Sequence, residues 1–144
     1  MFRNRESELK AIRNLINRPS ERCKAFLVYG RRRIGKSLLL KEAMKGYDGI
    51  AINFIATDET YSNIIKDLAR TVAESDPRLE HLGSIGELHG LLAGLKVSGL
   101  RIVLSLDEYP YMKQAYESGD LDSIFLREME SLGGNITIGF CGSY

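Results

Sequence analysis

The sequence predicts an α/β fold in which one parallel sheet lies between two layers of helices. Four short apolar runs alternate with amphipathic segments of about ten residues or more, an order that is typical of βαβ units. With 144 residues, of which 44% are hydrophobic, the chain is long enough to bury a core. No internal repeat and no second domain is visible, so residues 1–144 are interpreted as part of one domain.

The first predicted elements are a helix over residues 5–17 and a strand over residues 25–29. Aliphatic residues recur at three- and four-residue spacing in the helix, and Pro19 follows it. The strand is a continuous apolar run that ends at Gly30. Such a run is expected of a strand that is buried on both faces.

The next predicted elements are a helix over residues 37–45, a strand over residues 50–55 and a helix over residues 61–74. Leucines supply a buried side to the first helix, and Gly46 ends it. The strand is an apolar run that contains one polar residue, Asn53. Aliphatic residues share one face of the second helix, which an Asp-Pro pair breaks.

The remaining elements follow the same alternation of helix and strand. They are predicted as a helix, a strand, a helix and a strand over residues 85–95, 101–106, 120–132 and 136–141. Two glycines weaken the first of these helices. Asp120 and Asp122, at the start of the second helix, are interpreted as capping residues.

A glycine-rich segment joins the first strand to the following helix. It matches the Walker A pattern GxxxxGK[ST] as Gly30-Arg31-Arg32-Arg33-Ile34-Gly35-Lys36-Ser37. In this pattern the glycines let the backbone approach a phosphate, whose oxygens bind backbone N–H groups of the loop and helix end. Lys36 would neutralise the β- and γ-phosphates, and Ser37 would bind Mg²⁺. The alternative interpretation of the segment is a tight strand-to-helix turn that merely contains Lys and Ser.

The three arginines of the loop occupy the variable positions of the pattern. They would either contact a nucleic acid or a protein partner, or be solvated.

Two adjacent carboxylates, Asp107 and Glu108, follow the third predicted strand. This is the end of the strand at which open α/β sheets place their ligands. Asp107 fits the Walker B aspartate that holds Mg²⁺, and Glu108 fits the residue that polarises an attacking water. The 71 positions from Lys36 to Asp107 leave room for a further βα unit, which favours an ATPase over a small-molecule kinase or a GTPase. Two solvated acids in a turn are the alternative.

Two polar residues associated with other strands are weaker candidates. Ser143 follows the fourth strand and would sense the γ-phosphate if that strand lay between the first and the third. An ordinary turn serine fits its position equally well. Asn53 would restrain Glu108 through a hydrogen bond, but a satisfied core asparagine is the simpler interpretation.

Charge and hydropathy exclude several classes of protein. The 20 Lys and Arg balance 19 Asp and Glu to a net charge of +1, which argues against a globally basic nucleic-acid binder. The apolar runs are far shorter than the ~20 residues of a membrane-spanning helix, and no signal-peptide pattern opens the chain. We therefore expect a cytoplasmic protein in which both cysteines, Cys23 and Cys141, are reduced thiols.

Four motifs in sequence order resemble the archaeal-type ATPases of the AAA+/STAND group of P-loop NTPases. These are Phe2-Arg3-Asn4-Arg5-Glu6-Ser7-Glu8-Leu9, the Walker A segment, Leu106-Asp107-Glu108-Tyr109-Pro110-Tyr111 and Cys141-Gly142-Ser143. The resemblance implies binding and hydrolysis of ATP with Mg²⁺, nucleotide-driven conformational change and a sheet of order 5-1-4-3-2. It also implies that Phe2 and Arg5 lie near the adenine, and that Ser143 acts as a sensor beside the catalytic residues Lys36 and Glu108.

The resemblance covers only the first part of such an ATPase core. In that group a fifth strand, a helical lid and a winged-helix region that contacts DNA or partners usually follow, and residues 1–144 contain none of them. We therefore expect strands 1–4 of an incomplete three-layer P-loop NTPase fold. The arginine finger and lid arginine would fall beyond residue 144, so hydrolysis is expected to be weak. The strand over residues 25–29 would become an exposed sheet edge through which the chain self-associates.

A second function stays open beside ATP hydrolysis. The chain would then be a nucleotide-gated scaffold or regulator that acts on a protein or DNA partner with little turnover. Composition and motif spacing do not decide between the two functions.

Overall fold

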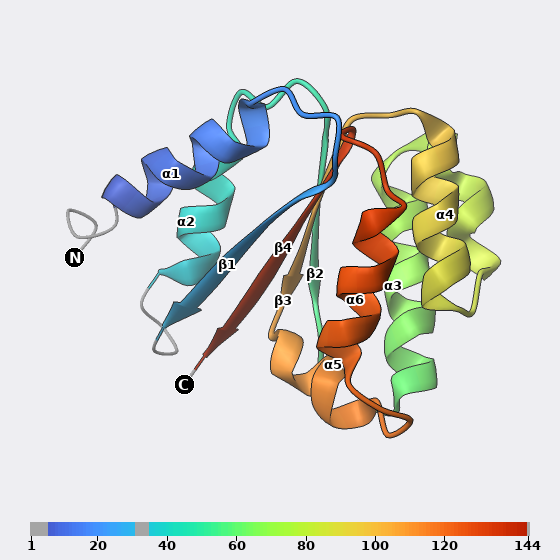
Figure 1. The fold of residues 1–144 in the computed structure, drawn as a ribbon. Helices are drawn as coiled ribbons and strands as arrows, with labels where there is room; N and C mark the ends of the chain where they lie inside the picture. Colours follow the sequence, from blue (N-terminus) through green and yellow to red (C-terminus); the bar gives the residue numbers. More distant parts are fainter. Residues whose placement is uncertain (1–5, 31–34, 144) are drawn as a thin grey trace.

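The computed structural model describes residues 6–30 and 35–143, except for the side chain of Ser37. The chain alternates helices and strands, as predicted (Figure 1). The strands are β1 (Lys24–Gly30), β2 (Ile50–Ile55), β3 (Ile102–Asp107) and β4 (Ile136–Ser143). The helices are α1 (Glu6–Asn17), α2 (Lys36–Ala43), α3 (Tyr61–Ser75), α4 (Leu88–Ser98), α5 (Tyr109–Ala115) and α6 (Leu121–Glu130), with a 3₁₀ helix, η2 (Pro77–Ser84), before α4.

The strands form one parallel sheet in the order β1-β4-β3-β2. β4, the last strand of the chain, therefore lies between the first and the third. The register places Gly30 beside Ser143 and Ile55 beside Asp107. Because the strands are parallel, their carboxyl ends meet at one edge of the sheet, where the predicted phosphate loop and acidic pair also lie (Figure 1).

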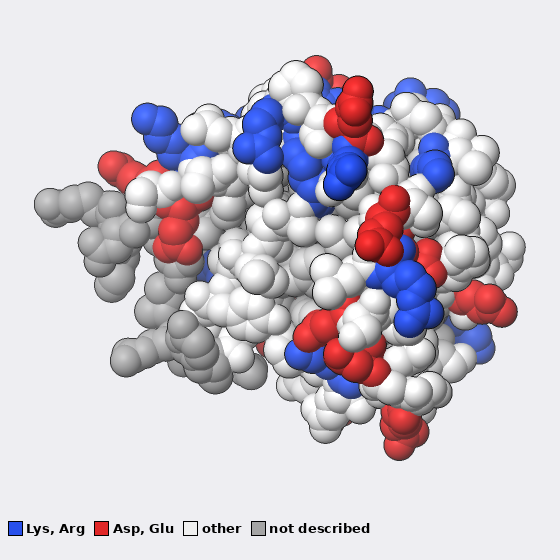
Figure 2. Space-filling view, in the orientation of Figure 1, with Lys and Arg blue, Asp and Glu red and all other residues white. Residues whose placement is uncertain are grey.

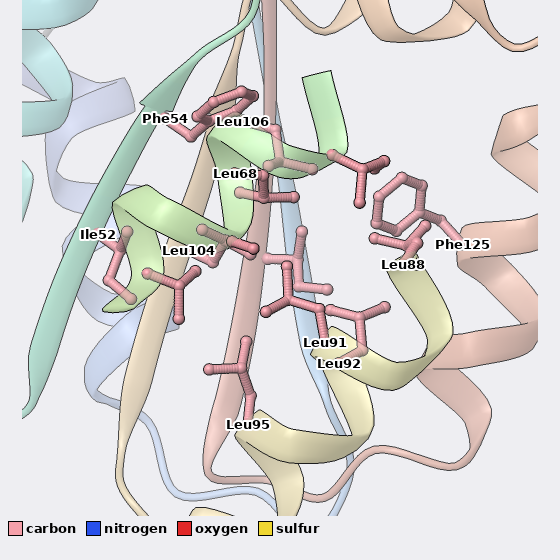
Figure 3. Close-up of a cluster of buried hydrophobic side chains, with 14 of the residues drawn as sticks. Ile52, Phe54, Leu68, Leu88, Leu91, Leu92, Leu95, Leu104, Leu106 and Phe125 are labelled. Atoms are coloured by element: carbon pink, nitrogen blue, oxygen red, sulfur yellow. The ribbon is translucent and has the colours of Figure 1, made fainter. Parts of the chain in front are cut away.

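Helices cover both faces of the sheet, which confirms the three predicted layers. On one face α1 and α2 pack against the sheet around Ile12, Ile16, Val28, Leu39 and Val103. The other face is covered by α3, α4, α5 and α6 and holds the larger core. There the leucines of α4 and Phe125 of α6 meet aliphatic side chains of β2 and β3 (Figure 3).

The prediction that the first strand is buried on both faces is wrong. Side chains of β1 alternate between buried and exposed, and Leu27 is 72% exposed. The physical reason is the place of β1 at the sheet edge, where one face is only partly covered by α6. In β3, an interior strand, every residue is buried.

Two helical elements were not predicted, namely α5 and η2. The glycine at position 94 explains why α4 lies close to η2. A Cβ atom there would lie 2.4 Å from Cδ2 of Leu82, so a larger residue at position 94 would require the Leu82 side chain to shift. α4 ends at Ser98, three residues beyond the predicted end, and Gly99 caps it in the left-handed conformation.

The carboxyl end of α1 is fixed by two cationic side chains from the sheet. No basic residue lies in the last turn of α1. Instead, Nζ of Lys24 in β1 donates hydrogen bonds to the carbonyl oxygens of Leu15, at 2.6 Å, and Arg18. Arg101, just before β3, donates to the carbonyl oxygen of Ile16 at 3.1 Å. Positive charge is favourable at this helix end, so these bonds hold α1 against the sheet. Burial lowers the pKa of Lys24, and the nearby charges of Arg101 and Arg18 lower it further.

Candidate functional site

The predicted phosphate loop lies between the end of β1 and the start of α2. Gly35 adopts the left-handed conformation, with φ 72° and ψ 23°, at the N-cap of α2. Its carbonyl oxygen accepts the first helical hydrogen bond, from the backbone N–H of Leu39 at 2.8 Å. Glycine adopts this conformation without strain, and among the described residues no atom outside its chain neighbours lies within 4 Å of where a Cβ would be. The backbone is therefore open to a close ligand at this point.

Several predicted site residues lie outside the described residues. They are Phe2, Arg5, Arg31, Arg32, Arg33 and Ile34, and the side chain of Ser37 is likewise not described. Their predicted contacts with adenine, phosphate and Mg²⁺ stay predictions.

Lys36 is the centre of the described part of the site. The residue is only 8% exposed, although it carries a charge. Its Nζ lies 3.0 Å from Oγ of Ser143, 3.5 Å from Oε1 of Glu108 and 3.6 Å from Oδ1 of Asp107. One cation from α2, two carboxylates from the end of β3 and the residue after it, and a hydroxyl group from β4 thus lie together.

Ser143 connects the cation to the carboxylate. Its Oγ accepts the hydrogen bond from Lys36 and donates one to Oε1 of Glu108 at 2.9 Å. This contact requires β4 to lie between β1 and β3, the condition on which the prediction for Ser143 depended. The position beside Gly30 places the hydroxyl group at the mouth of the phosphate loop.

Asp107 ends β3 with a side chain that is almost fully buried. Its Oδ1 accepts a hydrogen bond from the backbone N–H of Glu108 at 2.9 Å and also faces Lys36. A buried carboxylate is costly unless it is paired and hydrogen-bonded, and Asp107 meets both conditions. Behind it in β4, burial and secondly the charge of Asp107 raise the pKa of Cys141 to about 12, so that thiol is neutral at physiological pH.

The backbone of Glu108 is strained. Among the described residues it is the one non-glycine residue with a positive φ, at 55° with ψ 38°. The left-handed conformation costs a residue with a side chain roughly 1–2 kcal/mol. This conformation lets α5 begin immediately after β3, while the Glu108 carboxylate stays beside Lys36 and Ser143. Backbone strain of this kind clusters at functional sites.

α5, which the sequence analysis missed, holds Glu108 in place. Its first residue, Tyr109, packs edge-on against Phe125 of α6 and Phe140 of β4, at centroid distances of 5.8 and 4.9 Å. The Tyr109 hydroxyl donates a hydrogen bond to Oδ1 of Asp122 at 2.8 Å. Burial, followed by this hydrogen bond, raises the pKa of Tyr109. Pro110 in the first turn was a sequence signal for this helix.

Two weaker assignments are also settled by hydrogen bonds. Asp120 caps α6, because its side chain accepts from the backbone N–H of Asp122. Asp122 itself pairs with Tyr109 and Lys113 rather than acting as a cap. Asn53 accepts a hydrogen bond from Oγ of Ser105 at 2.7 Å. Among the described residues, the Glu108 carboxylate bonds to Lys36 and Ser143, so the simpler interpretation of Asn53, as a residue whose hydrogen bond is satisfied elsewhere, holds.

The described residues fit a magnesium nucleotide better than a tightly held metal ion. No group of three or more His, Cys, Asp or Glu side chains gathers as a metal cluster in the described ranges. Mg²⁺ is usually bound by one or two carboxylates together with substrate phosphates. Asp107 could supply such a carboxylate, and Lys36, whose Nζ lies 3.6 Å from Oδ1 of Asp107, could supply positive charge for a phosphate.

No protein-family model and no curated protein matches this sequence. Solved structures do match its fold. A Walker-type ATPase of Pyrococcus abyssi superposes with a TM-score of 0.70 at 20% identity, covering 96% of this chain and 44% of its own. CDC6P of Pyrobaculum aerophilum gives 0.67 at 19% identity, with 97% and 39% covered. The ORC2 protein of Aeropyrum pernix, solved as ADPNP-ADP complexes, gives 0.64 at 18%, with 96% and 41% covered.

The chain has the same α/β fold as these archaeal structures. The four-stranded parallel sheet with helices on both faces matches these archaeal structures over nearly the whole chain. The chain spans 39–44% of the length of the three structures. In the described part of the chain, each helix is too short or too polar to cross a bilayer.

The strain at Glu108 can be measured with two substitutions that remove the same carboxylate. We expect Glu108→Gly to be more stable than Glu108→Ala by about 1 kcal/mol, because glycine adopts the left-handed conformation without strain. The measurement is urea unfolding of both variants.

The matched control is Lys66, an exposed residue inside α3. There the order is expected to reverse, with the glycine variant about 1 kcal/mol less stable than the alanine variant. Equal stability of the two Glu108 variants would show that the backbone of Glu108 is not strained in solution.

Proposed function

We propose that this chain binds ATP with Mg²⁺ and forms a hydrolytic core whose conformation responds to the nucleotide. The observation that carries the proposal is the convergence of Lys36, Glu108 and Ser143 next to the left-handed glycine of the phosphate loop. The α/β fold that the chain shares with the archaeal structures supports it, since this convergence lies at the carboxyl edge of the sheet, where such folds bind their ligands.

Each described residue has a role that follows from its chemistry. The loop from Gly30 and the amino end of α2 would bind phosphate oxygens through backbone N–H groups. Lys36 would neutralise the β- and γ-phosphates. Asp107 would hold the metal ion together with Ser37, and Mg²⁺ when bound would neutralise charge on the phosphates. Glu108 would orient a water molecule and accept its proton.

The contacts of Lys36 give a physical route from nucleotide binding to conformational change. In this structure its Nζ is shared among Ser143, Glu108 and Asp107. A phosphate competes for the same ammonium group, so binding weakens the tie between Lys36 and Glu108. The Ser143 hydroxyl, which bonds to both, lies where it would register the exchange. α5 begins at the next residue and would follow any movement of Glu108.

Hydrolysis by the 144-residue chain alone is proposed to be slow. Within residues 6–30 and 35–143, Asp107 and Glu108 both form their ion pairs with Lys36. An additional arginine that stabilises the transition state contributes about 10³–10⁵ to the rate in related NTPases. A nucleotide-gated scaffold with little turnover is the second candidate, and the Lys36 contacts favour it because they change on binding without requiring hydrolysis.

Replacing Lys36 tests the nucleotide site. We expect Lys36→Ala to weaken ATP binding by at least about tenfold, because the variant loses a buried cation that faces the phosphates. The measurement is displacement of a fluorescent ATP analogue. Lys41→Ala is the matched control, since Lys41 is an exposed residue of the same helix. Equal affinities of wild type and Lys36→Ala would contradict the site.

Replacing Glu108 separates hydrolysis from binding. We expect Glu108→Gln to bind ATP as the wild type does but to lower the single-turnover hydrolysis rate by about 10²–10⁴, the usual contribution of a general base. Glu130→Gln, at an exposed position of α6, is the control. If the wild type hydrolyses ATP measurably and Glu108→Gln does so at the same rate, Glu108 is not the base. A wild type whose hydrolysis does not exceed the uncatalysed rate, together with intact binding, would favour the scaffold.

A further inference from the structure

Two glycines of β4 each lie beside an aromatic residue of β1. The register pairs Gly139 with Phe26 and Gly142 with Tyr29. In both pairs the aromatic ring covers the glycine, because a Cβ atom at either glycine would overlap the ring. Neither glycine has a positive φ, so the backbone alone would accept alanine at both positions. What glycine supplies here is therefore space for a ring rather than conformational freedom.

The two pairs lie on opposite faces of the sheet. Phe26 and Tyr29 are three positions apart in β1, and side chains of a strand alternate between the faces. Phe26 belongs to the smaller core, around α1 and α2, whereas Tyr29 lies on the face that α5 and α6 cover. Burial raises the pKa of Tyr29. Figure 2 shows a largely uncharged surface over β1, between α1 and α6. The contact between Tyr29 and Gly142 is therefore one of packing rather than of charge.

Pro110, in the first turn of α5, closes the space over Gly142 from a second direction. A Cβ atom at Gly142 would lie 2.5 Å from Cε2 of Tyr29 and 3.0 Å from Cδ of Pro110. Both distances are shorter than the usual contact between carbon atoms, about 3.5–4.0 Å. One ring from β1 and one from α5 thus lie over the backbone of β4 at Gly142.

The residue after Gly142 is Ser143, whose hydroxyl group belongs to the candidate site. Its side chain points to the face opposite the two rings, because successive residues of a strand alternate. There its Oγ accepts a hydrogen bond from Lys36 at 3.0 Å and donates one to Glu108 at 2.9 Å. The end of β4 is therefore enclosed from both sides, by the two rings on one face and by the polar contacts of Ser143 on the other.

We propose that Gly142 is a positioning residue for Ser143. The absence of a side chain at position 142 lets the two rings close over β4, and this closure sets how near the Ser143 hydroxyl lies to Lys36. A methyl group in the same space would push β4 toward α2 by about 1 Å, which is the difference between 2.5 Å and ordinary contact. A displacement of that size is enough to break the two hydrogen bonds of Ser143.

The consequence of this positioning for nucleotide binding rests on the proposed function. Ser143 would contact the γ-phosphate if the chain binds ATP, and ADP lacks that phosphate. A displaced Ser143 would therefore weaken the binding of ATP and leave the binding of ADP nearly unchanged. The property that Gly142 would control is the preference of the site for ATP over ADP.

The first test uses the nucleotide-free chain, so it does not depend on the proposed function. The NMR signal of the Lys36 ammonium group reports the neighbours of Nζ. We expect Gly142→Ala to shift this signal as Ser143→Ala does, because both variants take the hydroxyl group away from Nζ. Gly139→Ala is the matched control, since it crowds Phe26 in the same strand, four positions before Ser143. It is expected to leave the signal unchanged.

The second test measures the affinities for ATP and ADP by displacement of a fluorescent ATP analogue. Gly142→Ala is expected to lower the ratio of ATP to ADP affinity by about tenfold, the usual effect of losing a hydrogen bond to a charged group. Gly139→Ala is expected to keep the wild-type ratio. The double variant Tyr29→Ala/Gly142→Ala is expected to keep the ratio of Tyr29→Ala alone, because the added methyl group no longer meets a ring.

Tyr29→Ala alone is the variant to use if Gly142→Ala does not fold, since Tyr29 is partly exposed, at 39%. It is expected to shift the Lys36 signal of the nucleotide-free chain, because β4 then lacks one of the two rings that enclose it at Gly142. An unchanged Lys36 signal in Tyr29→Ala would overturn the proposal.

Three further outcomes would overturn the proposal. The first is a Lys36 signal that Gly142→Ala leaves in place, and the second is one that Gly139→Ala shifts equally. The third is a ratio of ATP to ADP affinity that Gly142→Ala lowers equally with and without the Tyr29 ring. A wild type that binds neither nucleotide would instead contradict the proposed function, and the Lys36 signal would still decide whether Gly142 positions Ser143.

Discussion

The contact of Lys36 with Asp107, Glu108 and Ser143 is the interaction on which the candidate site depends. It exists because β4 lies between β1 and β3, which brings the phosphate loop, the acidic pair and the end of the chain to one edge of the sheet. Each buried charge in the group is compensated by the others, so removing one would leave the rest costly to bury. Under the proposed function the same arrangement would make the group responsive to nucleotide, because a phosphate would compete directly for the shared cation.

The large core supports the site through α5. Glu108 holds a strained backbone, and strain persists only where the surrounding structure enforces it. Here the enforcement comes from Tyr109, whose ring packs against Phe125 and Phe140 and whose hydroxyl bonds to Asp122. Tyr109 directly follows Glu108 in the sequence. Its packing against α6 and β4 therefore restrains the orientation of the Glu108 carboxylate, the candidate catalytic group.

Much of the fold follows from the sequence, because apolar runs and turn residues report local structure directly. All four strands and their parallel pairing were predictable from these patterns, whereas the place of the fourth strand between the first and the third was implied only by the family resemblance. The exposed face of β1 was not, because burial of a strand depends on neighbours that its own residues do not specify. α5 was missed because it has only 7 residues, so its buried residues Tyr109 and Met112 supply a single helical spacing, which is too little to predict a helix. The hydrogen-bond partner of Asn53 could not be predicted, because it depends on the strand register that brings Asn53 beside Ser105.

In the candidate site, the Walker A residues could be identified from their sequence pattern alone. The role of Ser143 could be predicted only with knowledge of the strand order.

The central claim is that this convergence of charges is a site for a magnesium nucleotide. Calorimetric titration of the wild-type chain with ATP, ADP and GTP, each with and without Mg²⁺, tests it most directly. The account predicts saturable binding of one ATP per chain that Mg²⁺ tightens. Absence of saturable binding for every nucleotide, or binding that Mg²⁺ leaves unchanged, would contradict it.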